Sequence, residues 1–227
     1  MKAHTRETQS SMTPAKALQY LREGNERFVN NLRAHRDLLE QVNETRSGQF
    51  PFATIVTCID SRTSAELVFD QGLGDVFSAR IAGSVINDDI LGSLEFSCKI
   101  AGSRIIVVLG HTQCGAIKGA VDKVQLGNLS TLLNKIQPSV YRERTTVENR
   151  TSSNGPFVEK VMEIQTRRSV GQIVENSVLL REMIDANELY LIGAVYSVES
   201  GQVKFLDDTL LGQATSSPAP GAPEVRV

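Results

Sequence analysis

Two kinds of apolar pattern alternate along this chain. Short, mostly apolar runs have the length and β-branched content of buried strands, and they fall at residues 53–57, 75–79, 104–109 and 189–196. Segments that read as helices follow the first three of them, at residues 63–69, 89–100 and 115–124. This alternation predicts an α/β fold with a mostly parallel central β-sheet flanked by helices.

Helical patterns dominate both flanks of this core. Thr13 and Pro14 have the residue types of an N-cap and a first helical position, and apolar residues recur at roughly helical spacing as far as Leu32. We therefore predict an N-terminal helical arm over residues 13–33, which lies across this domain or a partner subunit. Residues 129–185 predict a helical C-terminal half, and residues 202–206 an edge strand.

The two ends of the chain lack such patterns. Residues 1–12 are polar and without period, which predicts a disordered leader. Residues 212–227 are rich in Pro, Ala, Ser and Gly, which predicts a disordered tail. Residues 13–211 are expected to form one domain, large enough to bury a core of its own.

Composition excludes several classes of function. A net charge of −2, with no block of like charges, argues against a nucleic-acid partner. The N-terminus has no apolar signal segment, and the longest apolar run, at 105–109, is too short for a bilayer, so we expect a cytoplasmic protein without a membrane partner. Three cysteines are too few for a disulfide scaffold. Cys98 falls within a helical pattern and is expected in the core.

The remaining cysteines belong to two motifs, Cys58-Ile-Asp-Ser-Arg62 and His111-Thr-Gln-Cys114, each at the end of a predicted strand. Because the carboxyl ends of parallel strands share one edge of a sheet, we expect both motifs in one crevice. Two thiols and an imidazole are a zinc ligand set, and three protein ligands leave a position open for catalysis. A structural zinc site would normally close with a fourth Cys or His.

Asp60 and Arg62 have a chemical reason to lie beside such a metal. Two thiolates neutralise the zinc charge, so bound water is acidified less than on three neutral histidines. Asp60 could accept a hydrogen bond from zinc-bound hydroxide and orient its lone pair, while Arg62 keeps the carboxylate ionised. Alternatively, Asp60 itself becomes the fourth ligand and closes the site, and pH selects between the two states.

The order and separation of the two motifs resemble the β-class carbonic anhydrases. The resemblance extends over most of the chain, including residues 17–28, 110–119 and 193–201. It implies that residues 13–211 are a catalytic domain that reversibly hydrates carbon dioxide to bicarbonate and a proton. It also implies one zinc ion per subunit on Cys58, His111 and Cys114, with Asp60 and Arg62 as a catalytic dyad. The implied assembly is a homodimer or a dimer-based tetramer, with the N-terminal helix embracing the partner.

The same resemblance assigns a small apolar substrate pocket. By position, Gln49 matches a glutamine that reaches across the dimer interface, and Phe77, Ala82 and Phe96 match the pocket lining. Plain core packing is the alternative for the two phenylalanines. The loop from Ile81 through Ala82 and Gly83 to Ser84 borders the site and departs from the family's usual Asn-Ala-Gly-Asn.

The chain contains no tryptophan, which separates it from the family's bicarbonate-regulated subgroup. Near neutral pH we therefore predict Asp60 paired with Arg62, and water, hydroxide or a small anion as the fourth zinc ligand. Two other functions stay open. The same fold could hydrolyse carbon disulfide or carbonyl sulfide. A different class is a non-catalytic zinc or redox-sensing module that uses Cys58 and Cys114 as a switchable pair.

Overall fold

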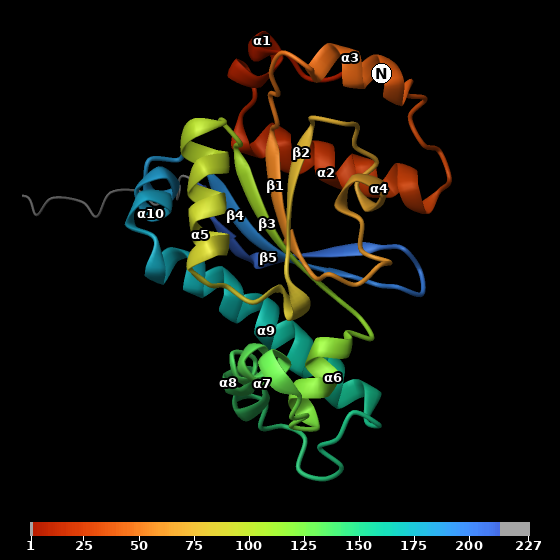
Figure 1. Ribbon diagram of the computed structural model, residues 1–227, viewed down its shortest axis with the longest axis vertical. Coiled ribbons are helices and arrows are strands. Elements are labelled where there is room, and N and C mark those ends of the chain that lie inside the picture. Colours follow the sequence, from red (N-terminus) through yellow and green to blue (C-terminus); the bar gives the residue numbers. More distant parts are fainter. Residues whose placement is uncertain (1, 214–227) are drawn as a thin grey trace, which may run out of the picture.

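The computed structural model describes residues 2–213, so the predicted tail lies almost wholly outside the described residues. Its centre is a five-stranded sheet of order β2-β1-β3-β4-β5 (Figure 1). The first four of these strands are parallel and β5 runs antiparallel to β4, which confirms the mostly parallel sheet. The bounds are β1 Ala53–Thr57, β2 Val76–Arg80, β3 Ile105–His111, β4 Tyr190–Tyr196 and β5 Val203–Leu211.

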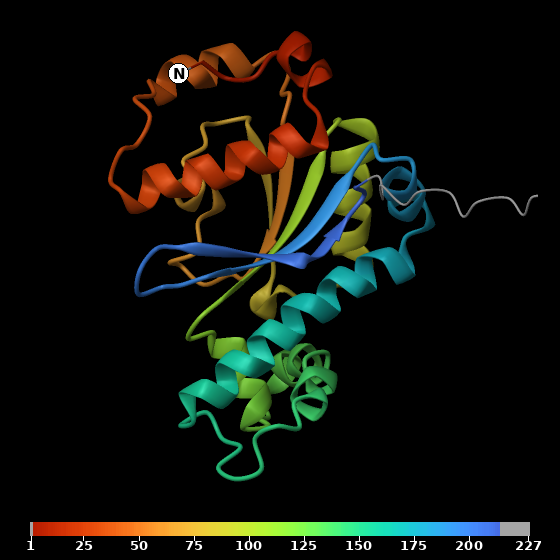
Figure 2. The same cartoon turned by 180° about the vertical axis from the view of Figure 1, so that it is seen from behind.

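Helices cover both faces of the sheet, which is why its central strands read as continuous apolar runs (Figures 1 and 2). Ile105, Val107 and Leu109 of β3 join the core formed with α2 (Pro14–Val29) and α4 (Ala65–Val68). Ile106 and Val108 join the opposite core, formed with α5 (Asp88–Glu95), α9 (Gly155–Asn176) and α10 (Val178–Asp185). The alternation follows from the two-residue period of a strand.

The C-terminal half is helical, as predicted, with a long interruption at residues 143–154. Three short helices, α6 (Gly115–Val121), α7 (Gly127–Asn134) and α8 (Gln137–Arg142), form a third apolar cluster with the start of α9. The predicted helix at 89–100 divides into α5 and a π-helical turn, η2 (Phe96–Ile100). Strand β5 extends five residues past the predicted edge strand, to Leu211, because pairing with β4 resumes after an irregularity.

The N-terminal arm is a single helix, α2, that crosses one face of the sheet (Figure 2). Thr13 caps it by accepting a hydrogen bond from the Lys16 amide, and Pro14 occupies the first turn. Gly24 allows α2 to pack closely against Phe69 at the end of α4, because a Cβ at this position would lie 1.9 Å from the Phe69 carbonyl oxygen. Leu32, included in the predicted arm, lies beyond the end of the helix and is 68% exposed.

The segment predicted to be a disordered leader is ordered over residues 2–12. Helix α1 (Arg6–Ser10) starts with a capping box between Thr5 and Thr8. The Gln9 amide donates to the carbonyls of Pro51 and Ala101, at 2.6 and 2.8 Å, and Met12 is buried. These few contacts to the start of the sheet hold a segment whose composition is polar.

A further short helix, α3 (Leu38–Thr45), is capped by Asp37 and was not predicted from the sequence. None of the helices within residues 2–213 is long and apolar enough to cross a membrane.

Candidate metal centre

Three potential metal ligands meet at the carboxyl ends of β1 and β3. Cys58 follows β1, His111 ends β3, and Cys114 is the N-cap of α6. Because β1 and β3 are parallel neighbours, with Thr57 paired to Leu109, the two motifs lie in one crevice, as predicted. The ligand atoms all lie within 4.8 Å of one another, and the two sulfurs are 4.0 Å apart. All three side chains are buried.

The imidazole of His111 is held in an orientation suited to a metal. Its Nδ1 lies 2.9 Å from the Thr112 carbonyl oxygen, so Nδ1 carries the proton and donates it. The lone pair of Nε2 is thereby left free. Nε2 is buried and finds no hydrogen-bond partner within residues 2–213. A buried, unsatisfied acceptor beside two thiols is costly unless a cation binds there, so the donor set fits zinc.

The two sulfurs share a hydrogen bond that separates their acidities. This bond lowers the pKa of Cys58 to about 4, against the opposing effect of burial. The same bond, together with burial, raises the pKa of Cys114. Without metal, the pair therefore holds one thiolate and one thiol, and a metal that binds both sulfurs displaces the remaining proton.

Asp60 and Arg62 form the predicted ion pair beside this cluster. Arg62 Nε donates to Asp60 Oδ1 at 2.9 Å and Arg62 Nη2 to Oδ2 at 2.8 Å, so the contact is bidentate. The hydrogen bond from the Arg62 side chain holds the pKa of the Asp60 carboxyl well below its usual range. The carboxylate is thus a constant negative charge at the mouth of the site.

Arg80, at the end of β2, is a residue of this site that the sequence did not indicate. Its guanidinium donates to the carbonyl oxygens of Cys58 and Asp60, at 3.1 and 2.6 Å. These bonds fix the backbone between Cys58, a potential metal ligand, and the Asp60 carboxylate. Sequence pattern gives no signal for them, because the contact joins two strand ends through the pairing of β1 and β2.

The turn η1 (Ala82–Ser84) borders the cluster, where sequence analysis placed Ala82 and Gly83. The Gly83 amide donates to Cys58 Sγ at 3.4 Å. Gly83 has φ +68°, and its missing side chain also makes room, because a Cβ there would lie 2.6 Å from Ile136 Cδ1.

The other three predicted pocket residues do not reach the cluster within one chain. Phe77 and Phe96 make an edge-on ring contact, with centroids 6.3 Å apart, in a groove of about 730 Å³ that none of the three potential ligands lines. Phe96 is 53% exposed rather than packed in the core. Gln49 is exposed in the segment before β1, whereas Cys58 follows β1, so the two lie at opposite ends of that strand.

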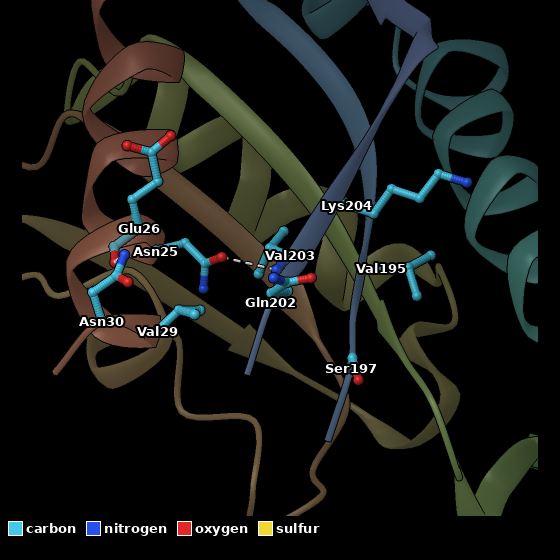
Figure 3. Close-up of a pocket in the computed structure, with 9 residues that line it drawn as sticks. All are labelled: Asn25, Glu26, Val29, Asn30, Val195, Ser197, Gln202, Val203 and Lys204. Carbon is cyan, nitrogen blue, oxygen red and sulfur yellow. Dashed lines mark hydrogen bonds between the residues drawn. The ribbon is translucent and has the colours of Figure 1, made fainter. Parts of the chain in front are cut away.

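A separate cavity of about 520 Å³ lies between α2 and the hairpin of β4 and β5 (Figure 3). None of the predicted site residues lines it. Its buried Asn25 accepts a hydrogen bond from the Val203 amide at 2.8 Å and donates to the carbonyls of Val68 and Gly201. Asn25 thereby fixes the arm on the hairpin.

A parallel α/β sheet with a buried Cys-His-Cys cluster at its strand ends, beside a carboxylate–guanidinium pair, is an arrangement that could hold a metal ion. The family model for carbonic anhydrase matches residues 53–203. The chain belongs to the β-class carbonic anhydrases, and it is an enzyme of that kind.

Curated relatives cover most of the chain. Carbonic anhydrase 2 of Mycobacterium tuberculosis is 33% identical over 200 residues, which are 86% of this chain and 93% of that protein. The carbonic anhydrase of Mycolicibacterium smegmatis is 30% identical over 197 residues, with coverage of 84% and 92%.

Solved structures share the fold. The β-carbonic anhydrase CafA of Aspergillus fumigatus superimposes with a TM-score of 0.66 at 25% identity, covering 85% of this chain and 90% of its own. A β-carbonic anhydrase of Sordaria macrospora, described as tetrameric, superimposes with a TM-score of 0.65 at 20% identity, with coverage of 74% and 89%.

Proposed function

We propose that this carbonic anhydrase hydrates carbon dioxide at a zinc ion held by Cys58, His111 and Cys114. The observation that carries the proposal is the free, buried Nε2 of His111 beside two sulfurs 4.0 Å apart. When bound, zinc supplies Lewis-acid chemistry that makes water a nucleophile near neutral pH.

Asp60 and Arg62 divide the remaining work between them. A carboxylate oxygen of Asp60 accepts a hydrogen bond from an O–H of the attacking water. This bond fixes the direction in which the lone pair of the water oxygen points. Arg62 keeps that carboxylate ionised and fixed through its bidentate contact. Ligation by Asp60 would require this contact to break or rearrange, which supports Asp60 as an acceptor rather than a fourth ligand.

The substrate pocket is proposed to be completed in a homodimer or a dimer-based tetramer. Phe77, Phe96 and Gln49 are away from the cluster in their own chain, so in this proposal they serve the site of a neighbouring subunit. The exposed Phe96 ring and the exposed apolar side chains of Leu39 and Val42 on α3 support such an assembly. An apolar lining suits carbon dioxide, which is small and uncharged. Sedimentation velocity checks this part, and a monomer at micromolar concentration contradicts it.

A cytoplasmic location belongs to the same proposal. None of the three cysteines forms a disulfide, which is the state that a reducing compartment maintains.

The decisive experiment is stopped-flow measurement of carbon dioxide hydration by metal-free and zinc-reconstituted protein. The expected rate rises in proportion to bound zinc until each chain holds one ion. No zinc-dependent rate above background would refute the proposal. Assays of the same preparation with carbonyl sulfide and carbon disulfide test the alternative substrates, and a faster zinc-dependent rate on either one would favour that alternative.

A further inference from the structure

A chain of buried hydrogen bonds leads from helices α8 and α9 to the turn η1, whose Gly83 amide contacts the sulfur of Cys58. Ser139 Oγ of α8 donates to Gln165 Oε1 at 2.7 Å, and Gln165 Nε2 donates to Ser169 Oγ at 3.1 Å. Ser169 Oγ in turn donates to the Ser84 carbonyl oxygen at 3.0 Å. The exposed fractions of these four side chains are 3% or less. The amide of Gln165 accepts at its oxygen and donates at its nitrogen, and the hydroxyl of Ser169 accepts one hydrogen bond and donates another.

The chain ends at a turn whose backbone conformation is unfavourable on its own. Gly83 and Ser84 both have positive φ, +68° and +48°, and the second of them carries a side chain. Such conformations persist where the surrounding structure determines them, and they concentrate at functional sites. Here the turn is held from two sides, because Ser84 Oγ also donates to the Leu109 carbonyl at 3.3 Å.

We infer that Ser169 and Gln165 are positioning residues that hold the Gly83 amide against the Cys58 sulfur. The inference rests on Cys58 being a metal ligand, as proposed above. An amide that donates to a ligand sulfur withdraws electron density from it, so the metal that it binds becomes more electron-poor.

The placement of these residues explains why helix α9 carries buried polar side chains. Gln165 and Ser169 are four residues apart on the buried side of α9 and contact α8 and η1, where apolar side chains would ordinarily be expected. A fully paired polar network is stable in such a place, but a half-paired one is not. Removing the Ser169 hydroxyl therefore frees the Ser84 carbonyl and relaxes the turn.

Cobalt substitution gives a direct test, because thiolate-to-cobalt charge-transfer absorption reports the sulfur and needs no turnover. In Ser169→Ala we expect this band at longer wavelength, because a sulfur that has lost its hydrogen bond is a better donor. We also expect about tenfold weaker metal affinity. Gln165→Leu should shift the band in the same direction by less, and Ser169→Thr should restore the wild-type spectrum.

Ser177→Ala is the matched control. Ser177 is also a buried serine, and its hydroxyl donates to Glu95 at 2.6 Å, with no link to Gly83. It should lower stability without moving the cobalt band. Identical spectra and metal affinities for Ser169→Ala and wild type would overturn the inference while leaving the proposed function intact. Absence of the band from the wild-type protein would overturn both.

Discussion

Substitution of Gly110 by alanine should push β3 away from α9 next to a proposed metal ligand. A Cβ at Gly110 would lie 2.2 Å from Thr166 Oγ1 and 2.9 Å from Met162 Sδ. The Met162 thioether can rotate, but the Thr166 side chain is short and bonded to the Met162 carbonyl at 3.1 Å. Overpacking of this kind costs about 3 kcal/mol at its upper range. In a chain of this size, that cost corresponds to a Tm lower by roughly 6–12 °C.

A double-mutant cycle isolates the clash. Thr166→Ala alone loses one buried hydrogen bond and should cost about 1 kcal/mol. In the double variant the nearest atom of residue 166 is Cβ, at 3.5 Å, which is an ordinary contact. The double variant should therefore be more stable than the sum of the single effects predicts, by about 1–2 kcal/mol.

Urea unfolding of the metal-free proteins measures the cycle, and zinc content after reconstitution shows whether His111 has moved. Gly110→Ala should bind zinc more weakly than wild type, and the double variant should recover most of the affinity. Strictly additive free energies would refute the reasoning, as would a Gly110→Ala variant within about 0.5 kcal/mol of wild type.

Three further outcomes are expected. Asp60→Asn should retain zinc and fold but lose about 10²–10³-fold in hydration rate by stopped flow; an unchanged rate would contradict the catalytic role proposed for Asp60. After zinc removal by a chelator, iodoacetamide should modify Cys58 first and spare Cys98, because burial raises the pKa of Cys98 to about 12. Mass spectrometry of peptides measures the order of modification, and faster labelling of Cys98 would contradict this prediction. The Arg62 hydrogen bond depresses the pKa of Asp60. The ion pair is therefore fully formed at any pH above the ordinary carboxyl pKa, and it is lost only as the pH falls through the depressed pKa. The ¹³C shift of the Asp60 carboxyl should thus stay flat from pH 9 to about 4, and a titration step near neutrality would contradict this.

Apolar runs made the parallel sheet predictable, because β1 and β3 are covered on both faces and buried at every position. The ordered leader was not predictable in the same way. Gln9 holds it through two main-chain carbonyls, and a sequence pattern carries no information on which carbonyls lie unpaired at the start of a sheet.

The meeting of Cys58, His111 and Cys114 was predictable, because their two motifs follow strands whose apolar pattern is strong. Arg80 and Ser169 were not, since each acts on backbone atoms that are distant in sequence and that only tertiary packing brings near. Gly110 did offer a signal that was missed: glycine within a buried strand indicates a close approach by another element. The resemblance assigned Phe77 and Phe96 to the pocket, but within this chain they line a groove that Cys58, His111 and Cys114 do not line.

The strand order has a consequence for how the protein matures. Between Cys58 and His111 the chain forms β2 on the outer side of β1, then α5, and returns as β3 on the inner side of β1. A slip of β3 by one residue would turn every side chain of that strand to the opposite face, including His111. A zinc site built from Cys58 and His111 would therefore exist only in molecules with the correct strand register, and the metal content after reconstitution would measure the fraction of such molecules.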